Sequence, residues 1–433
     1  MRISRAWVVV LMLAIAYAFS FVDRQILVLL VQPIRAAIEI DDVQFSLLHG
    51  FAFAVTYAVF GLPLGWLADI GNRKYIIIFG IVVWSLATAA CGLATSFQQL
   101  FSARIFVGIG EAALVPAVYS LLADLFPKDQ RARPMAVFMS GSTCGAGLAL
   151  WLGGFALAGA SVMSSWHIPV IGVADAWRVT FMLVGLPGVA LAVALMWVVR
   201  EPARRELVER STHSRQMFGT LGYLWGRRSQ IIPMYLGFAC FSLAVYAFSA
   251  WIPEVFRRSY QWAPQDFAMI AGPVQIGASL CGVLLSSVII EYWQRRGYQN
   301  SALRLSVMVA ALLAGLMMLF GLASTANFSL IVFGFCWFFI GFLLPAPGLV
   351  LQMILPPQRV ALASALFLLV ANLIGLSGGP TAVALITRYV FQSDAALGIS
   401  VVVVCVLALL LSASLLQLTR KRLYIAGTES VNP

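Results

Sequence analysis

The stretch Val401–Leu411 reads VVVVCVLALLL, and it decides the fold class because it is apolar throughout. A strand of a transmembrane β-barrel alternates apolar residues that face lipid with polar residues that face the lumen, and this run does not alternate. A continuous apolar segment satisfies its backbone in lipid by forming an α-helix. The stretch therefore predicts a membrane-spanning helix.

The same apolar character extends over nearly the whole chain of 433 residues. Hydrophobic residues make up 61% of it and charged residues 10%, which leaves too little polar side-chain area to cover a water-soluble globule of this size. A helix needs roughly 20 apolar residues to cross the hydrocarbon core. We predict an all-α membrane protein with twelve spans, near residues 6–31, 45–68, 75–95, 98–123, 134–158, 177–199, 231–255, 265–291, 304–323, 329–354, 362–387 and 396–417.

The positive charge is distributed unevenly about these spans. The net charge is +11. Twelve spans place both termini on the same side of the membrane, and most Lys and Arg fall on that side. Such an excess marks the cytoplasmic side. We therefore predict a multi-pass protein of the plasma membrane, the inner membrane in a bacterium, with both termini cytoplasmic. The placement explains the charge without a nucleic-acid partner. The basic residues expected outside or at outer helix ends are Arg35, Arg178, Arg257, Arg258 and Arg388.

A long polar stretch divides the spans into six and six. The segment Pro127–Arg131 is echoed by Pro356–Arg359 at the corresponding place in the second half, which indicates a parallel repeat with a substrate site between the halves near the membrane midplane. The predicted organisation is an N-terminal six-helix half at 1–199, a cytoplasmic central loop at 200–230, a C-terminal six-helix half at 231–417 and a cytoplasmic tail at 418–433.

The sequence predicts neither a metal site nor a cofactor. The six cysteines are isolated from one another and fall within predicted spans, where Cys behaves as a small hydrophobic residue. The N-terminal segment resembles a signal peptide, but its apolar pattern continues to Val31 without a small-residue cleavage site. We interpret it as the first span.

The loop between the second and third spans carries the strongest local motif, Gly65-Trp-Leu-Ala-Asp69-Ile-Gly-Asn-Arg73-Lys74. A carboxylate and two cations in so short a loop can hold neighbouring helix ends together by ion pairs and contacts with helix termini. We predict a cytoplasmic gate formed by Gly65, Asp69, Arg73 and Lys74. The alternative, a plain basic loop, explains Arg73 and Lys74 but not the other two residues.

This loop resembles the signature of the major facilitator superfamily, with Ile70 and Asn72 as departures from it. The closer resemblance is to the spinster-like branch. It extends over nearly the whole chain and rests on Asp23-Arg24, Gly65–Lys74, Arg104–Ala112, Ala123–Phe126 with Asp129–Arg131, Trp177-Arg178, Arg200-Glu201-Pro202 and Ala363–Gly375. Thr387-Arg388-Tyr389 departs from the branch. The resemblance implies two six-helix halves and transport by alternating access, with the first, fourth, seventh and tenth spans lining the cavity.

Four ionisable residues lie within predicted spans: Asp23, Arg24, Arg104 and Glu111. A charge at the membrane midplane costs at least about 2.5 kcal/mol, and such residues mark functional sites. Arg104 and Glu111 are two helical turns apart and point the same way. We predict a ladder of charges along a cavity, with a static buried ion pair as the alternative.

The predicted roles follow from this ladder and from the resemblance, which adds that such residues serve proton coupling and substrate binding. We expect Asp23 or Glu111 to take up the proton, and substrate to bind Arg24, Arg104, Glu111, Tyr246 and Asn372. For Asn372, a role in packing between helices is an equal alternative to substrate binding. His49, at the outer start of the second span, is expected to be solvated rather than a gating residue.

The predicted function is secondary active transport, coupled to protons by symport or antiport, of an amphipathic organic anion or zwitterion, either lipid-like or an organic acid. The expected partners are a small-molecule substrate, protons and the lipid bilayer, and we expect a monomer to suffice. Two alternatives stay open: a drug or metabolite exporter that works by proton exchange, and a sensor that keeps the fold without transporting. An enzyme is not expected, because the sequence offers no cluster of acids, histidines or metal ligands.

Overall fold

The computed structural model describes residues 3–127, 130–163, 167–168, 172–173, 175–202, 219–298 and 300–429. Within them, twelve helical segments are long and apolar enough to cross a membrane, and they match the predicted spans in order and approximate bounds. The all-α prediction is confirmed for the described residues, with one small addition: a two-residue antiparallel pairing of β1 (His167–Ile168) with β2 (Gly172–Val173).

The chain packs as two compact units. The first comprises Met1–Glu206 with Ala250–Ile276, and the second Leu207–Ser249 with Gly277–Pro433. Two long helices therefore contribute to both: α11 (Arg228–Tyr260) and α12 (Pro264–Arg295). The boundaries that the sequence predicts for the halves stay a prediction.

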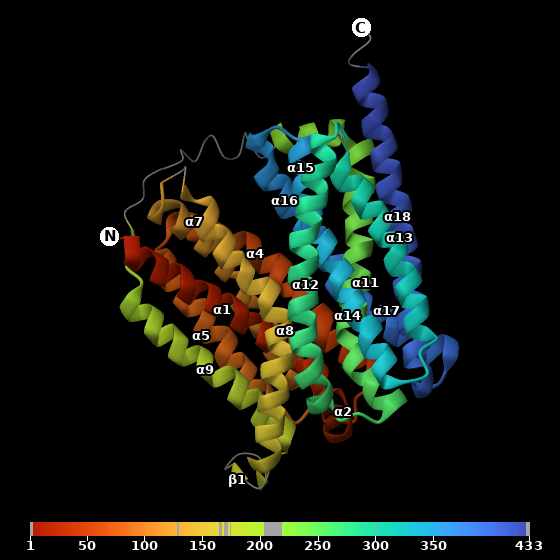
Figure 1. The fold of residues 1–433 in the computed structure, drawn as a ribbon. Helices are drawn as coiled ribbons and strands as arrows, with labels where there is room; N and C mark the ends of the chain where they lie inside the picture. The colour runs from red at the N-terminus through yellow and green to blue at the C-terminus, as the bar shows by residue number, and fades with distance from the viewer. Residues whose placement is uncertain are drawn as a thin grey trace. The chain divides into compact units, whose positions relative to one another are not determined.

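The first unit holds the N-terminal spans, in which α1 packs along α8 while α5 packs along α6 and α9 (Figure 1). It also holds β1, β2, the C-terminal part of α11 and the N-terminal part of α12. The other elements are α1 (Ile3–Leu29), α2 (Val31–Ile38), α3 (Asp42–Ser46), η1 (Leu47–Phe51), α4 (Ala52–Ile70), α5 (Arg73–Cys91), α6 (Phe97–Ala112), α7 (Leu114–Leu125), α8 (Ala132–Met163) and α9 (Ala176–Val198).

The second unit holds the remaining spans, in which α13 packs along α14 and α18. Residues 219–226 are helical and precede α11. The other elements are α13 (Ser301–Gly321), α14 (Ala326–Leu343), α15 (Ala346–Ile354), α16 (Pro357–Ala371), η3 (Asn372–Ser377), α17 (Gly378–Leu385), η4 (Ile386–Phe391), η5 (Asp394–Ala396) and α18 (Leu397–Glu429).

The fourth and tenth spans are both broken by proline. Helix α6 ends at Ala112 and α7 starts at Leu114, because Pro116 has no N–H to donate to the carbonyl of Ala112. Pro345 lies at the corresponding break between α14 and α15. The break in the fourth span follows Glu111 directly, so it lies beside one of the predicted site residues.

Close helix approach fixes α5 against α6. A Cβ atom on Gly110 would lie 2.7 Å from the carbonyl oxygen of Gly80 and 2.7 Å from the backbone nitrogen of Trp84. Only glycine fits at such a crossing, as is common where transmembrane helices pack. The crossing fixes α6, and with it Glu111, in depth and rotation.

In the described residues, three short π-helical segments interrupt the spans: η1, η3 and η4. A π turn re-aims side chains by one residue and is often found at functional sites. His49 lies inside η1 and Asn372 begins η3. The sequence does not predict these turns.

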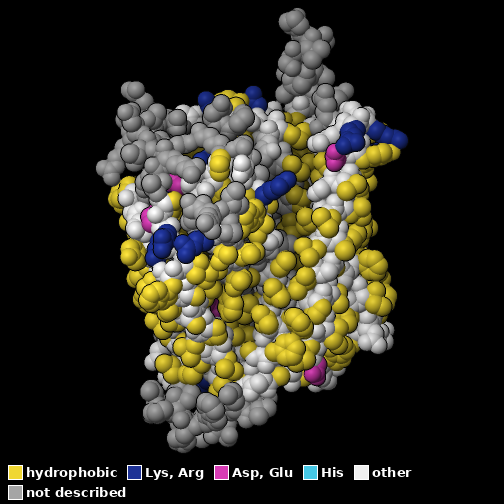
Figure 2. Space-filling model, turned by 60° about the vertical axis from the view of Figure 1, so that its left-hand side comes forward, with side chains coloured by type: hydrophobic (Ala, Val, Ile, Leu, Met, Phe, Trp, Pro, Cys, Tyr) yellow, Lys and Arg dark blue, Asp and Glu magenta, His cyan; other side chains and the backbone are white. Residues whose placement is uncertain are grey.

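The outer surface suits lipid. Figure 2 shows one face on which hydrophobic side chains cover the broad middle, whereas Lys and Arg gather mainly in the upper half. Large apolar side chains are strongly exposed, as at Trp197 (83%) and Leu322 (80%). Such exposure on many helices is what a bilayer-embedded protein requires.

Candidate functional site

A buried ion pair joins α1 to α6 in the first unit. Nη2 of Arg24 donates to Oε2 of Glu111 at 2.5 Å, and the two residues are 7% and 2% exposed. The guanidinium also lies over two aromatic rings, with its Cζ 4.7 Å from the centroid of Phe21 and 4.2 Å from that of Phe53. Cation–π contacts of this kind partly replace the lost hydration of a buried arginine.

Arg104 lies beside this pair and is fully buried. Its Nη1 donates to the backbone carbonyl of Asp23 at 3.2 Å, and its Nε donates to the carbonyl of Leu48 at 3.5 Å. The structure thus brings Arg104 to Asp23 through the backbone of Asp23 and not through its carboxylate. The guanidinium–carboxylate contact in this region is the one between Arg24 and Glu111.

His49 belongs to the same region, and the expectation that it is solvated is wrong. The residue is 1% exposed. It follows Leu48, whose carbonyl accepts from Arg104, and it interacts electrostatically with both arginines. We call Asp23, Arg24, His49, Arg104 and Glu111 the buried cluster.

Several polar atoms of the buried cluster have hydrogen-bonding capacity left over. Among the described residues, no partner is found for Oδ1 of Asp23, Oε1 of Glu111, Nη2 of Arg104 and both ring nitrogens of His49. Buried polar groups are nearly always paired, so unsatisfied ones call for an explanation in terms of ligand, proton or water. The cluster therefore holds unpaired donors and acceptors beyond those of the Arg24–Glu111 ion pair.

The predicted cytoplasmic gate is built around Arg73, which is 1% exposed. Its guanidinium pairs with Asp124 and, through Nε at 2.6 Å, with Glu201, and it donates to the carbonyls of Ser120 and Pro202. The backbone N–H of Lys74 donates to the other oxygen of Glu201 at 2.9 Å. We call Arg73, Asp124 and Glu201 the latch.

The other two predicted gate residues differ in what the structure describes. Gly65 lies opposite Pro116, so that a Cβ atom there would be 3.6 Å from the Cβ of Pro116. Asp69 lies in the last turn of α4, but its side chain is outside the described part of the structure. Asp124 and Glu201 are the partners that the sequence interpretation missed, although both fall in motifs that it singled out.

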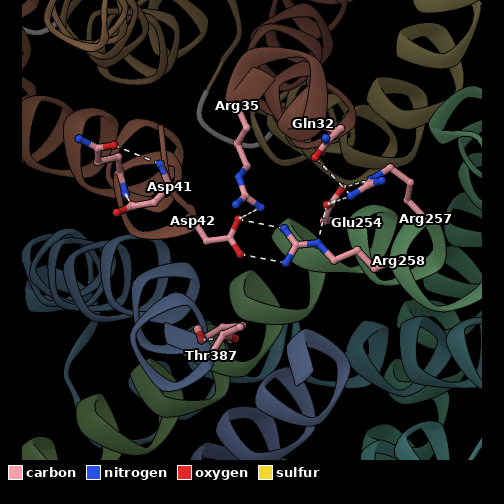
Figure 3. A network of polar contacts seen from close by, with 10 residues as sticks. Gln32, Arg35, Asp41, Asp42, Glu254, Arg257, Arg258 and Thr387 are labelled. Carbon is pink, nitrogen blue, oxygen red and sulfur yellow. Dashed lines mark hydrogen bonds and ion pairs between the residues drawn. The ribbon is translucent and has the colours of Figure 1, made fainter. Parts of the chain in front are cut away.

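A second set of charges ties α2 and α3 to the end of α11, and the sequence interpretation missed it (Figure 3). Asp42 accepts from Arg35 at 2.9 Å and from both terminal nitrogens of Arg258 at 2.9 and 3.0 Å. Glu254 accepts from Arg258 at 2.6 Å and from Arg257 at 2.7 and 2.9 Å. These five residues form the outer ion cluster, named for its predicted orientation.

The predicted substrate residues of the second half lie in the second unit. Tyr246 is on α11, and a Cβ atom on Gly375 would lie 3.1 Å from its ring. Asn372 begins the π turn that contains Gly375. Within the described residues there is no group of three or more metal-ligating side chains.

The model of the Major Facilitator Superfamily matches residues 13–380. The chain belongs to this family. It is 26% identical over 391 residues to a protein described as an MFS-type efflux pump of Mycolicibacterium smegmatis, covering 88% of this chain and 85% of that one. It is 28% identical over 408 residues to human protein spinster homolog 1, covering 89% and 73%.

The solved structures agree on the fold. A bacterial homolog of the human lysosomal transporter Spinster, in an inward-facing and unoccupied conformation, superposes with a TM-score of 0.79 at 22% identity, covering 97% of this chain and 96% of that one. The resemblance to the spinster-like branch is therefore confirmed. The chain is a membrane transporter of the major facilitator type, and its family and fold are those of transporters rather than enzymes.

Proposed function

We propose that this transporter couples the movement of an amphipathic organic anion or zwitterion to protons, by alternating access, with both termini in the cytoplasm and a monomer as the working unit. The observation that carries the proposal is the buried cluster, in which two carboxylates and two guanidinium groups lie together with hydrogen-bonding atoms to spare. A group that must exchange protons and ligand cannot be saturated by the protein.

The coupling step is a change in the charge balance of the cluster. When Asp23 and Glu111 are both ionised, they balance Arg24 and Arg104. Uptake of one proton leaves one positive charge in excess, which favours entry of an anion into a region of low dielectric. Release of the proton restores the pair of Glu111 with Arg24 and expels the anion. Glu111 suits this role best, since its carboxylate contacts the guanidinium that its protonation would free.

The amphipathic character of the substrate is inferred from the contrast between the two units. The charged head would bind Arg24 and Arg104. In the second unit the substrate contacts would be Tyr246 and Asn372, and this unit also holds packed aromatic side chains such as Phe238 and Phe367, whose ring centroids lie 6.1 Å apart. A compound with one anionic end and an apolar body satisfies both surroundings.

Export by proton exchange is the second candidate, since one relative is described as an efflux pump. In that case the substrate would bind the ionised carboxylates of the buried cluster, where it competes with the proton, and the two would occupy the cluster in alternation.

The test uses the purified full chain in liposomes with a pH-sensitive dye inside and a panel of amphipathic acids, zwitterions and sugars outside. An acid or zwitterion is expected to change the internal pH, and Glu111→Gln or Asp23→Asn should abolish the change. Glu39→Gln, which alters an exposed carboxylate, is the matched control and should behave like the unmodified protein. Coupling that survives in both buried variants would contradict the proposal.

A further inference from the structure

The turn between α12 and α13, in the second unit, is fixed by its backbone. Gly297 has φ +85°, its N–H donates to the carbonyl of Gln294 at 2.9 Å, and the N–H of Tyr298 donates to the carbonyl of Trp293 at 3.0 Å. This pair of bonds closes the helix as a Schellman motif, and the rings of Trp293 and Tyr298 supply its usual side-chain contact, with centroids 6.5 Å apart. The two rings are therefore held in place before any ligand arrives.

Two arginines lie on the aromatic rings of this turn. The guanidinium of Arg304 is 5.5 Å from the ring centroid of Trp293 and 5.0 Å from that of Tyr298, and the guanidinium of Arg296 is 4.6 Å from the ring of Tyr292. Neither makes an ion pair with any residue that the structure describes. Their neighbour Arg295 differs, since it pairs with Glu291 at 2.5 Å.

The position of Arg304 is unfavourable without an anion nearby. It lies in the first turn of α13, where the helix dipole is positive and the first N–H groups have no partner within the helix. Asn300, the N-cap residue, makes no side-chain cap hydrogen bond. An anion with several acceptor oxygens at this helix end would balance the charge of Arg304 and accept from the free N–H groups.

Each of the two arginines ends a stripe of lipid-exposed apolar side chains. On α12 the stripe runs through Leu284 and Val288, exposed by 69% and 61%, to Tyr292 and Arg296 at four-residue spacing. On α13 it runs from Arg304 to Met308 and Leu312, exposed by 54% and 47%. A residue every four positions stays on one face of a helix. Both stripes would suit acyl chains below a charged head group.

We propose that Arg296 and Arg304 bind the phosphate of an anionic phospholipid from the inner leaflet, with Tyr292, Trp293 and Tyr298 at the level of the head groups. The leaflet follows from the predicted orientation of the chain. Guanidinium groups suit phosphate oxygens, aromatic rings suit the interface, and basic residues beside a span attract anionic lipid. The site is separate from the buried cluster, so its test does not depend on the transport mechanism.

The experiment measures lipid retained by the purified full chain in mixed micelles of phosphatidylglycerol and phosphatidylcholine, by native mass spectrometry. The unmodified protein is expected to retain phosphatidylglycerol in preference. The double variant Arg296→Gln/Arg304→Gln should bind it about tenfold less tightly. Arg295→Gln, which removes an adjacent arginine that already has a partner, should change binding less than about twofold.

Two further arms make the result decisive. Arg304→Lys keeps the charge and should retain most of the lipid binding, which separates loss of the site from misfolding. Monodisperse elution of each variant in size-exclusion chromatography checks that it is folded. Inorganic phosphate or glycerol phosphate in about a hundredfold excess should not displace the lipid, because neither offers acyl chains. Equal lipid binding by the double variant would overturn the proposal, and so would displacement by free phosphate.

Discussion

The buried cluster and the outer ion cluster are built from the same residue types and differ in how completely these are satisfied. Both carboxylates of the outer ion cluster accept from two arginines each. In the buried cluster Glu111 has one arginine partner, and atoms of Asp23, His49 and Arg104 have none among the described residues. A saturated cluster holds helices together, whereas an unsaturated one has atoms available for a proton and a ligand. We therefore propose a structural role for the outer ion cluster and a role in transport for the buried cluster.

The largest effect is expected at the buried cluster. Glu111→Gln keeps the size of the side chain but leaves Arg24 as a buried cation without its carboxylate. Breaking a buried pair in this way costs about 3–5 kcal/mol of stability. Because Gln cannot take up or release a proton, proton-driven uptake should fall by about a hundredfold or more. Uptake of the labelled substrate into proteoliposomes measures it. The double variant Arg24→Gln/Glu111→Gln should regain the thermal stability that Glu111→Gln loses, because no lone charge of this pair is left buried. It should not regain the uptake.

At the outer ion cluster we expect a loss of stability without a loss of coupling. Arg258→Gln takes a cation from Asp42 and from Glu254 at once, which should lower the free energy of unfolding by about 2–4 kcal/mol. Thermal unfolding of the purified protein, followed by intrinsic fluorescence, measures the change. The ratio of protons moved to substrate molecules moved should be the same as in the unmodified protein. A changed ratio would mean that this cluster also takes part in transport, and the contrast between the clusters would fail.

Helix packing beside the buried cluster gives a third, smaller effect. Gly110→Ala places a methyl group 2.7 Å from backbone atoms of α5, so α6 must shift at a cost of about 1–3 kcal/mol. Gly315→Ala is the matched control, because no atom lies within 4 Å of its Cβ position. Equal melting temperatures for the two variants would show that the crossing does not fix α6.

The smallest effect is expected at the latch. Glu201→Gln removes one of the two carboxylates on Arg73 and leaves Asp124 in place. Because Glu201 is partly exposed, the loss should be about 1 kcal/mol or less, with transport slowed no more than a few-fold. Initial rates of uptake at saturating substrate check this. Arg73→Gln, which loses both pairs, should be several times worse than Glu201→Gln.

The spans and four of the five members of the buried cluster were predictable from the sequence for simple physical reasons. Apolar runs of sufficient length set the spans, and Asp23, Arg24, Arg104 and Glu111 stand out because ionisable residues are rare within such runs. The spacing of Arg104 and Glu111 placed both on one face of α6. Their partners were not predictable, because the rotation of α6 depends on close packing, such as that of Gly110 on α5, and not on periodicity.

The remaining misses have related causes. His49 lies near a predicted span end, where solvent is expected, but it falls within the π turn η1 and is buried. Asp42 and Arg258 pair across 216 positions of sequence, and each alone reads as an ordinary charge at a span end. A sequence without aligned homologues carries no signal for such pairs.

Substrate exchange compared with proton-driven accumulation tests the central claim most directly. In proteoliposomes loaded with unlabelled substrate, the Glu111→Gln variant should still exchange labelled substrate at no less than about a tenth of the unmodified rate, since a neutral residue mimics the protonated carboxylate. The same vesicles should not accumulate substrate in response to a pH gradient. Accumulation in that variant, driven by the gradient as in the unmodified protein, would contradict the assignment of proton coupling to the buried cluster.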